Sequence, residues 1–258
     1  TCLLNNQIYI GTITKTTNDT AGVFITVTGS SATVYAYINI IVNLTSPILS
    51  CTYGMVYLDI TKINIQTHTT STTYFTLNSG TLLANIGVLS PLGNNSNIVY
   101  FDIPYGTSII NIYSIAFSSS ISIGTLYRSA VTTIPSYGVL NLYHINISCV
   151  DLILADTSIT SATILSSLEL NIHTCYIVKS ALTRIIYCDC ARMYITFINV
   201  RIYMNTSVSV IYVTSNDDTL SPLVTVTTDY FDGNCIFAEI DMLRGVFFSY
   251  ALYCRSTI

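Results

Sequence analysis

The hydrophobic pattern of the chain contains a spacing that neither a regular strand nor a helix explains. In VLNLYHINIS (residues 139–148) four apolar residues form two pairs; one residue separates the members of each pair, and a Tyr-His dipeptide separates the pairs. Side chains on one face recur every two residues in a strand and every 3.6 residues in a helix. The spacing therefore predicts a strand, a sharp two-residue corner and a second strand. Its inward-facing residues would be Leu140, Leu142, Ile145 and Ile147.

The same spacing recurs along the chain. Its copies begin at residues 35, 58, 110, 140, 170 and 195, so most neighbouring copies are 23 to 30 residues apart. A fixed period of this length is typical of repeat proteins that stack one unit on the next. The long gap between the second and third copies has room for two units, and a degraded copy is expected there near Phe75, Leu77, Gly80 and Leu82. The other copies are Tyr35, Tyr37, Ile40, Val42; Leu58, Ile60, Ile63, Ile65; Ile110, Ile112, Ile115, Phe117; Leu170, Ile172, Cys175, Ile177; and Ile195, Phe197, Val200, Ile202.

Stacked units of this kind predict a coil in which each strand lies parallel to the equivalent strand of the next turn. Apolar side chains would form ladders inside the coil, and Ser, Thr and Asn would form ladders outside. The second corner residue should tolerate left-handed backbone angles, and Asn39 and Asn199 occupy that position. One internal ladder is expected to contain Leu58, Ile112, Leu142, Ile172 and Phe197.

Four segments, VYLDITKINIQ, LNLYHINIS, LELNIHTCYIV and YITFINVRIYM, carry a resemblance to the right-handed parallel β-helix superfamily with the pectin-lyase-like fold. The likeness covers roughly residues 34–213 and is one of repeat pattern. It implies an all-β, right-handed parallel β-helix with rungs of about 23–30 residues, a fold shared by polysaccharide lyases, bacterial adhesins and repeat-bearing surface proteins. The alternative is a β-sandwich or jelly roll, because GVFITVTGSSATVYAYI also has the short alternating strands of that class.

The repeat predicts one β-helical domain over residues 1–258. Residues 1–33 would form N-terminal strands or a cap, residues 34–213 the repeat rungs, and residues 214–258 a turn-rich loop with a C-terminal rung or cap. The chain begins at Thr1, as expected if a leader has been removed or if the sequence is a piece of a longer protein.

Composition separates the chain from ordinary soluble enzymes. Of its 258 residues 51% are hydrophobic and only 9% are charged, against about 25% charged in a typical soluble domain. The hydrophobic content excludes a disordered chain. The net charge of −4 includes no basic cluster, which argues against nucleic-acid binding. No apolar run reaches the roughly 18 residues of a membrane-spanning helix. A surface of Thr, Ser, Asn and Tyr suits extracellular or self-packing proteins.

The cysteines indicate an oxidising compartment. Eight cysteines in a charge-poor chain favour disulfides for some pairs, and buried free thiols are the alternative. Cys188 and Cys190 would share one face of a strand, but a single close pair is only half of a zinc site, so no metal is expected. The candidate disulfide residues are Cys2, Cys51, Cys149, Cys175, Cys188, Cys190, Cys235 and Cys254.

Five N-x-S/T sequons mark candidate glycosylation sites. A chain so rich in Ser and Thr contains about this number by chance, so only their placement is informative. Asn146 lies between the inward-facing Ile145 and Ile147 and should therefore point outward. The five candidates are Asn18, Asn43, Asn94, Asn146 and Asn205.

No catalytic motif is evident in the sequence. The resemblance to β-helix polysaccharide hydrolases implies clustered aspartates followed by G-H-G and R-x-K, but Asp217-Asp218 stands alone in a turn-rich segment. His144 and His173 lie at corners of successive rungs and would make an incomplete metal site. Neither a G-x-S-x-G elbow nor a phosphate loop is present. We expect no catalytic residues and no cofactor.

Two functions from different classes follow. The first is a non-enzymatic extracellular structural or adhesive protein that self-associates, because few charges protect its strand edges and neither TCLLNNQIYIG nor VFFSYALYCRSTI resembles a polar cap. The second is a carbohydrate-active enzyme, a lyase or hydrolase of the pectin-lyase-like fold. A viral or host-interaction glycoprotein is a further alternative. The expected partners are other copies, extracellular proteins or glycans.

Overall fold

A computed structural model describes most of the chain. The described residues are 6–14, 23–42, 47–66, 73–92, 98–118, 122–131, 136–159, 166–189, 192–204, 207–215, 222–242, 245–252 and 254–255. They form strands and turns, and within these ranges no helix is long and apolar enough to cross a membrane.

The strands form two sheets, and every pairing between described strands is parallel. The 12-stranded sheet contains, in spatial order, β1 (Asn6–Thr14), β3 (Thr33–Val42), β5 (Met55–Gln66), β7 (Thr81–Leu92), β9 (Gly106–Ser118), β11 (Ser136–Cys149), β13 (Ser167–Lys179), β15 (Arg192–Tyr203), β17 (Leu223–Thr228) and β20 (Val246–Ala251), with the short β18 (Phe231–Gly233) and β21 (Cys254–Arg255) off this path. The 9-stranded sheet contains, from the C-terminal side, β19 (Ile236–Met242), β16 (Ser209–Ser215), β14 (Ile186–Asp189), β12 (Asp151–Ile159), β10 (Ser122–Val131), β8 (Val99–Asp102), β6 (Thr73–Leu77), β4 (Leu49–Cys51) and β2 (Ile25–Val27).

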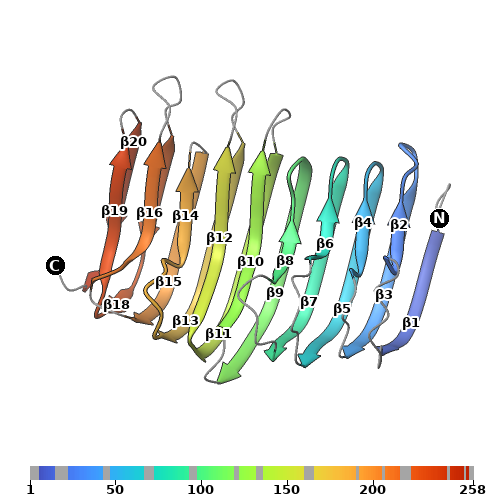
Figure 1. Ribbon diagram of the computed structural model, residues 1–258, viewed down its shortest axis with the longest axis horizontal. Coiled ribbons are helices and arrows are strands. Elements are labelled where there is room, and N and C mark those ends of the chain that lie inside the picture. Colours follow the sequence, from blue (N-terminus) through green and yellow to red (C-terminus); the bar gives the residue numbers. More distant parts are fainter. Residues whose placement is uncertain are drawn as a thin grey trace.

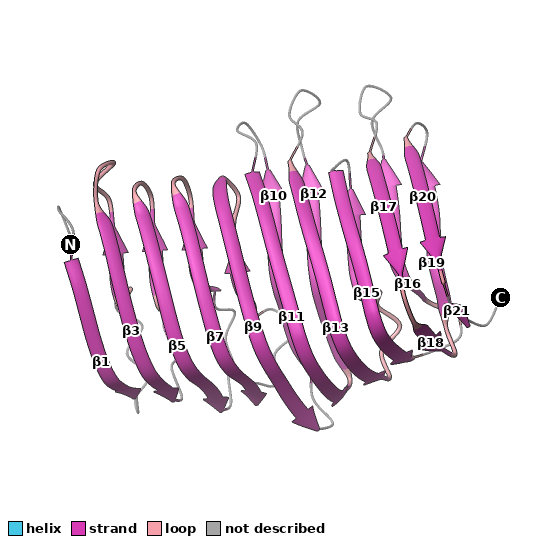
Figure 2. Cartoon of the chain, turned by 180° about the vertical axis from the view of Figure 1, so that it is seen from behind, coloured by secondary structure: helices cyan, strands magenta, loops and turns pink. Residues whose placement is uncertain are grey.

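The chain winds as a right-handed coil. From β1 to β17 consecutive strands alternate between the two sheets, and each strand pairs with its equivalent one turn later. Figure 1 shows the 9-stranded sheet with its strands side by side and the two termini at opposite ends of the coil. Figure 2, turned by 180° from Figure 1, shows the 12-stranded sheet on the opposite side of the coil. This confirms the predicted right-handed parallel β-helix and excludes the sandwich.

The apolar spacing of VLNLYHINIS forms the predicted corner. In β11, Leu142 and Ile145 are buried, whereas the two residues between them are not. At the same place in β13 and β15 the second corner residue has a positive φ, 52° at Thr174 and 54° at Asn199. The left-handed conformation predicted for Asn199 is therefore confirmed, and the corner turns the strand while both of its halves keep their apolar residues inside.

The first repeat is shifted by one residue from the predicted frame. The residues predicted to face inward, Tyr35, Tyr37, Ile40 and Val42, are not buried. Tyrosine has an apolar ring and a polar hydroxyl, so it can occupy the outer face of a strand where the pattern alone assigns it to the core. The buried residues of β3 are instead Val34, Ala36, Ile38 and Ile41.

The shift also changes the corner of β3. Asn39 pairs with Thr61 of the next corner, since its neighbours Ile38 and Ile40 pair with Ile60 and Lys62. It is therefore the first corner residue and not the second, and it is not among the described residues with positive φ.

The repeat expected near Phe75 lies elsewhere. Phe75 and Leu77 are buried in β6, which belongs to the 9-stranded sheet and contains no corner. The missing rung is β7, which lies in register with both β5 and β9. Its buried residues are Leu82, Ala84, Ile86 and Leu89.

The predicted internal ladder is correct in four of its five members. Ile112, Leu142, Ile172 and Phe197 are buried and in register from β9 to β15. Leu58 is also buried, but it lies in the neighbouring ladder, because strand register aligns it with Ala84 and Ile110 and not with Ile112. Its place in the predicted ladder belongs to Ile60.

Glycines hold the turns that precede three successive rungs. Gly54, Gly80 and Gly106 have φ of 91°, 99° and 94°. The turns stack, with the Thr81 amide donating to the Gly54 carbonyl oxygen and the Thr107 amide donating to that of Gly80, both at 2.9 Å. A Cβ atom at position 80 would run into the Gly54 carbonyl oxygen.

We therefore expect Gly80→Ala to lower the free energy of unfolding by about 1–3 kcal/mol, through backbone strain and the clash. Chemical denaturation would measure the loss. Gly11→Ala is the matched control, because a Cβ there meets nothing within 4 Å. Equal stability of the two variants would contradict the stacked-turn arrangement.

Candidate functional site

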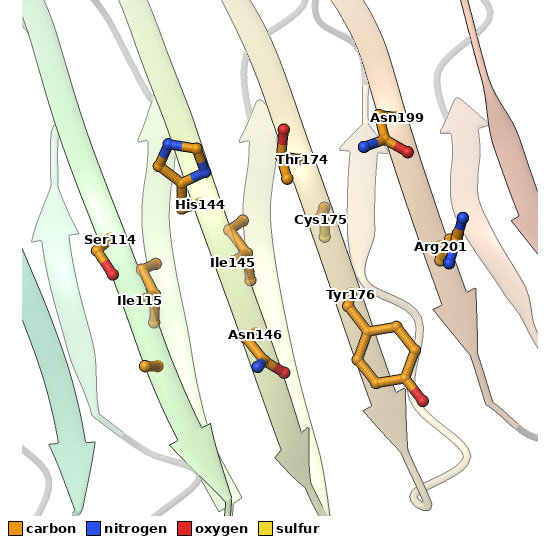
Figure 3. A pocket seen from close by; sticks show the side chains of 11 residues that line it. Ser114, Ile115, His144, Ile145, Asn146, Thr174, Cys175, Tyr176, Asn199 and Arg201 are labelled. Carbon is orange, nitrogen blue, oxygen red and sulfur yellow. The ribbon is translucent and has the colours of Figure 1, made fainter.

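The main candidate site is a groove on the outer face of the 12-stranded sheet, just beyond the corners of β9, β11, β13 and β15 (Figure 3). Its volume is about 360 Å³. Its lining residues are Ser114, Ile115, Ala116, His144, Ile145, Asn146, Thr174, Cys175, Tyr176, Asn199 and Arg201.

Strand register explains how these residues meet. Ala116, Asn146, Tyr176 and Arg201 are register partners on four successive strands, so they form one row across the groove. The second corner residues form one edge of the groove, and Ile115, Ile145 and Cys175 are buried beneath it. Arg201 is the one lining residue with a permanent charge. The groove thus combines an apolar floor, an aromatic ring and several hydrogen-bonding groups.

Amide side chains form a ladder on the same sheet, on the other side of the corners. The Nδ2 atom of Asn111 donates to Asn85 at 2.8 Å, that of Asn141 to Asn111 at 2.7 Å, and that of Asn171 to Asn141 at 2.9 Å. This is a polar ladder of the kind that the repeat predicts outside the coil. Each interior amide is hydrogen-bonded to the amides of the rungs on both sides. These groups therefore stabilise the surface and are not free to bind a ligand.

Tyrosines stack in ladders as well. The ring centroids of Tyr9 and Tyr37 are 4.9 Å apart and those of Tyr35 and Tyr57 are 4.6 Å apart, with nearly parallel planes. In each pair one ring face is covered by the tyrosine of the neighbouring rung. Tyr176 differs, because its contact with Tyr203 is tilted by 55° at 5.9 Å.

The two corner histidines occupy different positions. His173, a first corner residue, stacks on Tyr143 with ring centroids 5.3 Å apart. His144, a second corner residue, is exposed at the edge of the groove. Among the described residues no three His, Cys, Asp or Glu side chains are grouped as metal ligands.

Most described cysteines are inside the coil. Cys51, Cys149, Cys175 and Cys235 are buried free thiols in this structure. Burial raises the pKa of Cys51, Cys149 and Cys235 to about 11, so these thiols stay protonated and weakly nucleophilic at neutral pH. Cys188 is buried and Cys254 is exposed, while Cys2 and Cys190 lie outside the described residues. The disulfides stay a prediction.

Of the five sequons, one falls within the described residues. Asn146 is exposed on β11, as its position between two inward-facing isoleucines predicts. The other candidate asparagines and the Asp217-Asp218 pair lie outside the described residues: Asn18, Asn43, Asn94 and Asn205.

The sequence did not reveal a buried ion pair at the end of β13. Lys179 occupies an inward position, and its Nζ atom lies 3.1 Å from Oδ1 of Asp151 and donates to the Ala181 carbonyl oxygen at 3.3 Å. Thr183 donates to the same Asp151 oxygen and accepts from Lys179. Burial lowers the Lys179 pKa, and Asp151 partly offsets this. The site has no exposed cationic atom, which indicates a structural role.

The long edge strands of the 12-stranded sheet, β1 and β20, present exposed aromatic side chains, and the short edge strand β21 carries Arg255, which is paired with Asp232. In β20 the outward side chains Phe248 and Tyr250 are exposed, Tyr250 by 65%. In β1 Tyr9 is exposed, and Ile8 and Ile10 are half-buried against the core. Neither β1 nor β20 contains a charged residue.

No protein-family model, curated protein or solved structure matches the chain. The class of protein is therefore defined by its architecture, a right-handed parallel β-helix. The resemblance to the pectin-lyase-like superfamily is a likeness of that architecture and repeat pattern.

Proposed function

We propose that the chain is a non-enzymatic structural or adhesive subunit of an extracellular assembly, in which copies join end to end by parallel strand pairing. The β20 edge of one copy would pair with the β1 edge of the next. The low charge of the whole chain, 9% of residues, supports a function that depends on packing against other surfaces.

One observation carries this proposal. The outward ladder that begins with Tyr9 and Tyr37 at the β1 edge ends with Tyr250 at the β20 edge, through unbroken register across the sheet. A copy added in register would place Tyr9 on Tyr250, continuing the stacking already seen between Tyr9 and Tyr37. Edge strands also present unpaired backbone groups that a further parallel strand satisfies.

Small residues favour the same junction. Ser249 and Ala251 of β20 lie in the two inward ladders that begin with Ile8 and Ile10 of β1. A docked copy would bring these isoleucines over small side chains, which leaves room for them. The pairing of β20 with β1 would bury apolar surface from two uncharged strands, so salt should screen it little.

The assembly is tested with purified protein of 258 residues by light scattering and analytical ultracentrifugation. We expect concentration-dependent oligomers that persist in molar NaCl.

Tyr250→Lys should raise the concentration for half-assembly by about tenfold or more, because a charge would be buried at the junction. Tyr194→Lys is the matched control, since Tyr194 is exposed on the same sheet but in an interior strand. A protein that stays monomeric at high concentration would refute the proposal, as would oligomers that dissociate in salt alone.

A further inference from the structure

The groove contains a residue that can be modified. Asn146 begins the sequon Asn-Ile-Ser and is exposed on β11, in the middle of the groove. Its register partner on one side is Ala116, whose small side chain leaves space. Its partner on the other side is Tyr176. A group attached to the Asn146 amide would therefore begin directly beside an aromatic ring.

The Tyr176 ring is available for such a contact. The residue is 44% exposed, its ring contact with Tyr203 is tilted and not stacked, and Figure 3 shows the ring broadside, next to Asn146 and between it and Arg201. The carbon-bound hydrogens of a pyranose ring pack well on the face of a tyrosine, while amide and guanidinium groups bind its hydroxyl and N-acetyl groups. With neighbouring strands about 4.8 Å apart, Arg201 is roughly one sugar ring beyond Tyr176.

We propose that Asn146 carries an N-linked glycan whose innermost N-acetylglucosamine lies in the groove against Tyr176, with Arg201 as a hydrogen-bond donor at its far side. The groove, at about 360 Å³, is near the lower limit of the usual range of ligand cavities, about 300–1,000 Å³, and so suits one or two sugar rings. A covalently attached sugar is held at high effective concentration, so a shallow groove is sufficient. This inference rests on the extracellular part of the proposed function.

The modification is an ordinary group transfer. The Asn146 Nδ2 atom forms a bond to C1 of the N-acetylglucosamine of a lipid-diphosphate-linked oligosaccharide and loses one proton. The bond between C1 and the diphosphate oxygen breaks, and the lipid diphosphate leaves with its electron pair. Ser148 supplies the hydroxyl that the sequon requires. No oxidation or reduction occurs.

The first experiment measures occupancy. The 258-residue chain is expressed behind a secretion signal in cultured animal cells, and total and secreted protein are denatured and treated with peptide-N-glycosidase in H₂¹⁸O. Mass spectrometry of the peptides should show Asn146 converted to ¹⁸O-labelled Asp in most molecules, and Ser148→Ala should abolish this. Because transfer precedes folding, total cell protein gives the answer even for a variant that does not fold. An unmodified Asn146 in both fractions overturns the inference.

The second experiment measures packing in the groove. The same glycosidase is applied to native protein, and release at Asn146 is followed with time. Tyr176→Thr should speed release about tenfold, because the sugar loses its aromatic support, while Tyr176→Phe should keep the slow rate. Tyr194→Thr, outside the groove, is the control and should change nothing. Equal release from the wild-type protein and Tyr176→Thr overturns the seating of the glycan.

The outcomes separate this inference from the proposed assembly. The groove lies on β9 to β15, in the interior of the sheet, and the proposed junction uses the edge strands β1 and β20. Oligomers that form with Asn146 unmodified would overturn the glycan alone. A protein that stays monomeric although Asn146 is modified and its glycan lies in the groove would overturn the assembly alone.

Discussion

Replacing Leu142 with alanine is expected to lower the free energy of unfolding by about 2–5 kcal/mol. Leu142 is fully buried in β11, in register with Ile112 on one side and Ile172 on the other. Parallel ladders hold the backbone on both sides, so neighbouring rungs can collapse little into the cavity that the substitution leaves. The loss then includes both the transfer of the removed carbons and the cavity itself.

Urea denaturation followed by circular dichroism would measure this loss. Leu182→Ala is the matched control, because Leu182 is 65% exposed in the segment between β13 and β14 and its truncation should change stability by less than about 0.5 kcal/mol. If Leu142→Ala cost no more than the control, the internal ladder would be wrong at this rung.

The corner spacing made most of the fold predictable. Two apolar pairs separated by two residues fit a bent strand and little else, so β9, β11, β13 and β15 could be recognised from their residues alone. Across these strands the ladders that contain Leu140, Leu142, Ile145 and Ile147 lie as that spacing requires. The pattern succeeds because the inside of a coil admits hardly any polar side chain.

The pattern fails where both faces of a strand are apolar. In VYAYINII the alternation fits two frames, and the outward frame contains tyrosines whose hydroxyls favour water. In β7 the inward set includes Ala84 and the corner begins with Gly87, so its apolar signal is weak. The strands of the 9-stranded sheet are often short, and β8 has three consecutive buried residues without alternation. Such segments need their neighbours to fix the frame.

The candidate site was only partly predictable. The outward position of Asn146 followed from its buried neighbours, and His144 was placed correctly at a corner. The groove itself depends on register across four strands, which brings together residues up to 87 positions apart, from Ser114 to Arg201. The Lys179–Asp151 pair was hidden for a related reason, because Lys179 looks like the polar end of a strand until its inward position is known.

The buried pair of Lys179 and Asp151 gives the second large expected effect on stability. Asp151→Asn is expected to lower the free energy of unfolding at pH 7 by about 3–5 kcal/mol, because it leaves the charge of Lys179 buried without its counter-ion. The asparagine keeps an Oδ1 atom in place to accept from the Leu152 amide, which now donates to Asp151 at 2.8 Å, so the loss reports the charge and not the local turn. Adding Lys179→Met to this variant should recover much of the stability, because it removes the unpaired charge.

The same variant should regain stability as pH rises. In the folded variant burial lowers the Lys179 pKa, and the ion pair and hydrogen bond with Asp151 that raise it are lost, whereas the unfolded chain keeps a pKa near the ordinary 10.5. Between the two values the unfolded chain binds more protons, so the free energy of unfolding increases with pH. Denaturation at pH 7, 8 and 9 should therefore show the difference from wild type shrinking.

Asp102→Asn is the matched control: its partner Arg128 is 37% exposed and does not titrate in this range, so the loss should be about 1 kcal/mol and independent of pH. A loss in Asp151→Asn that equals this control, or that stays constant from pH 7 to 9, would show that Lys179 is not buried as a charged group.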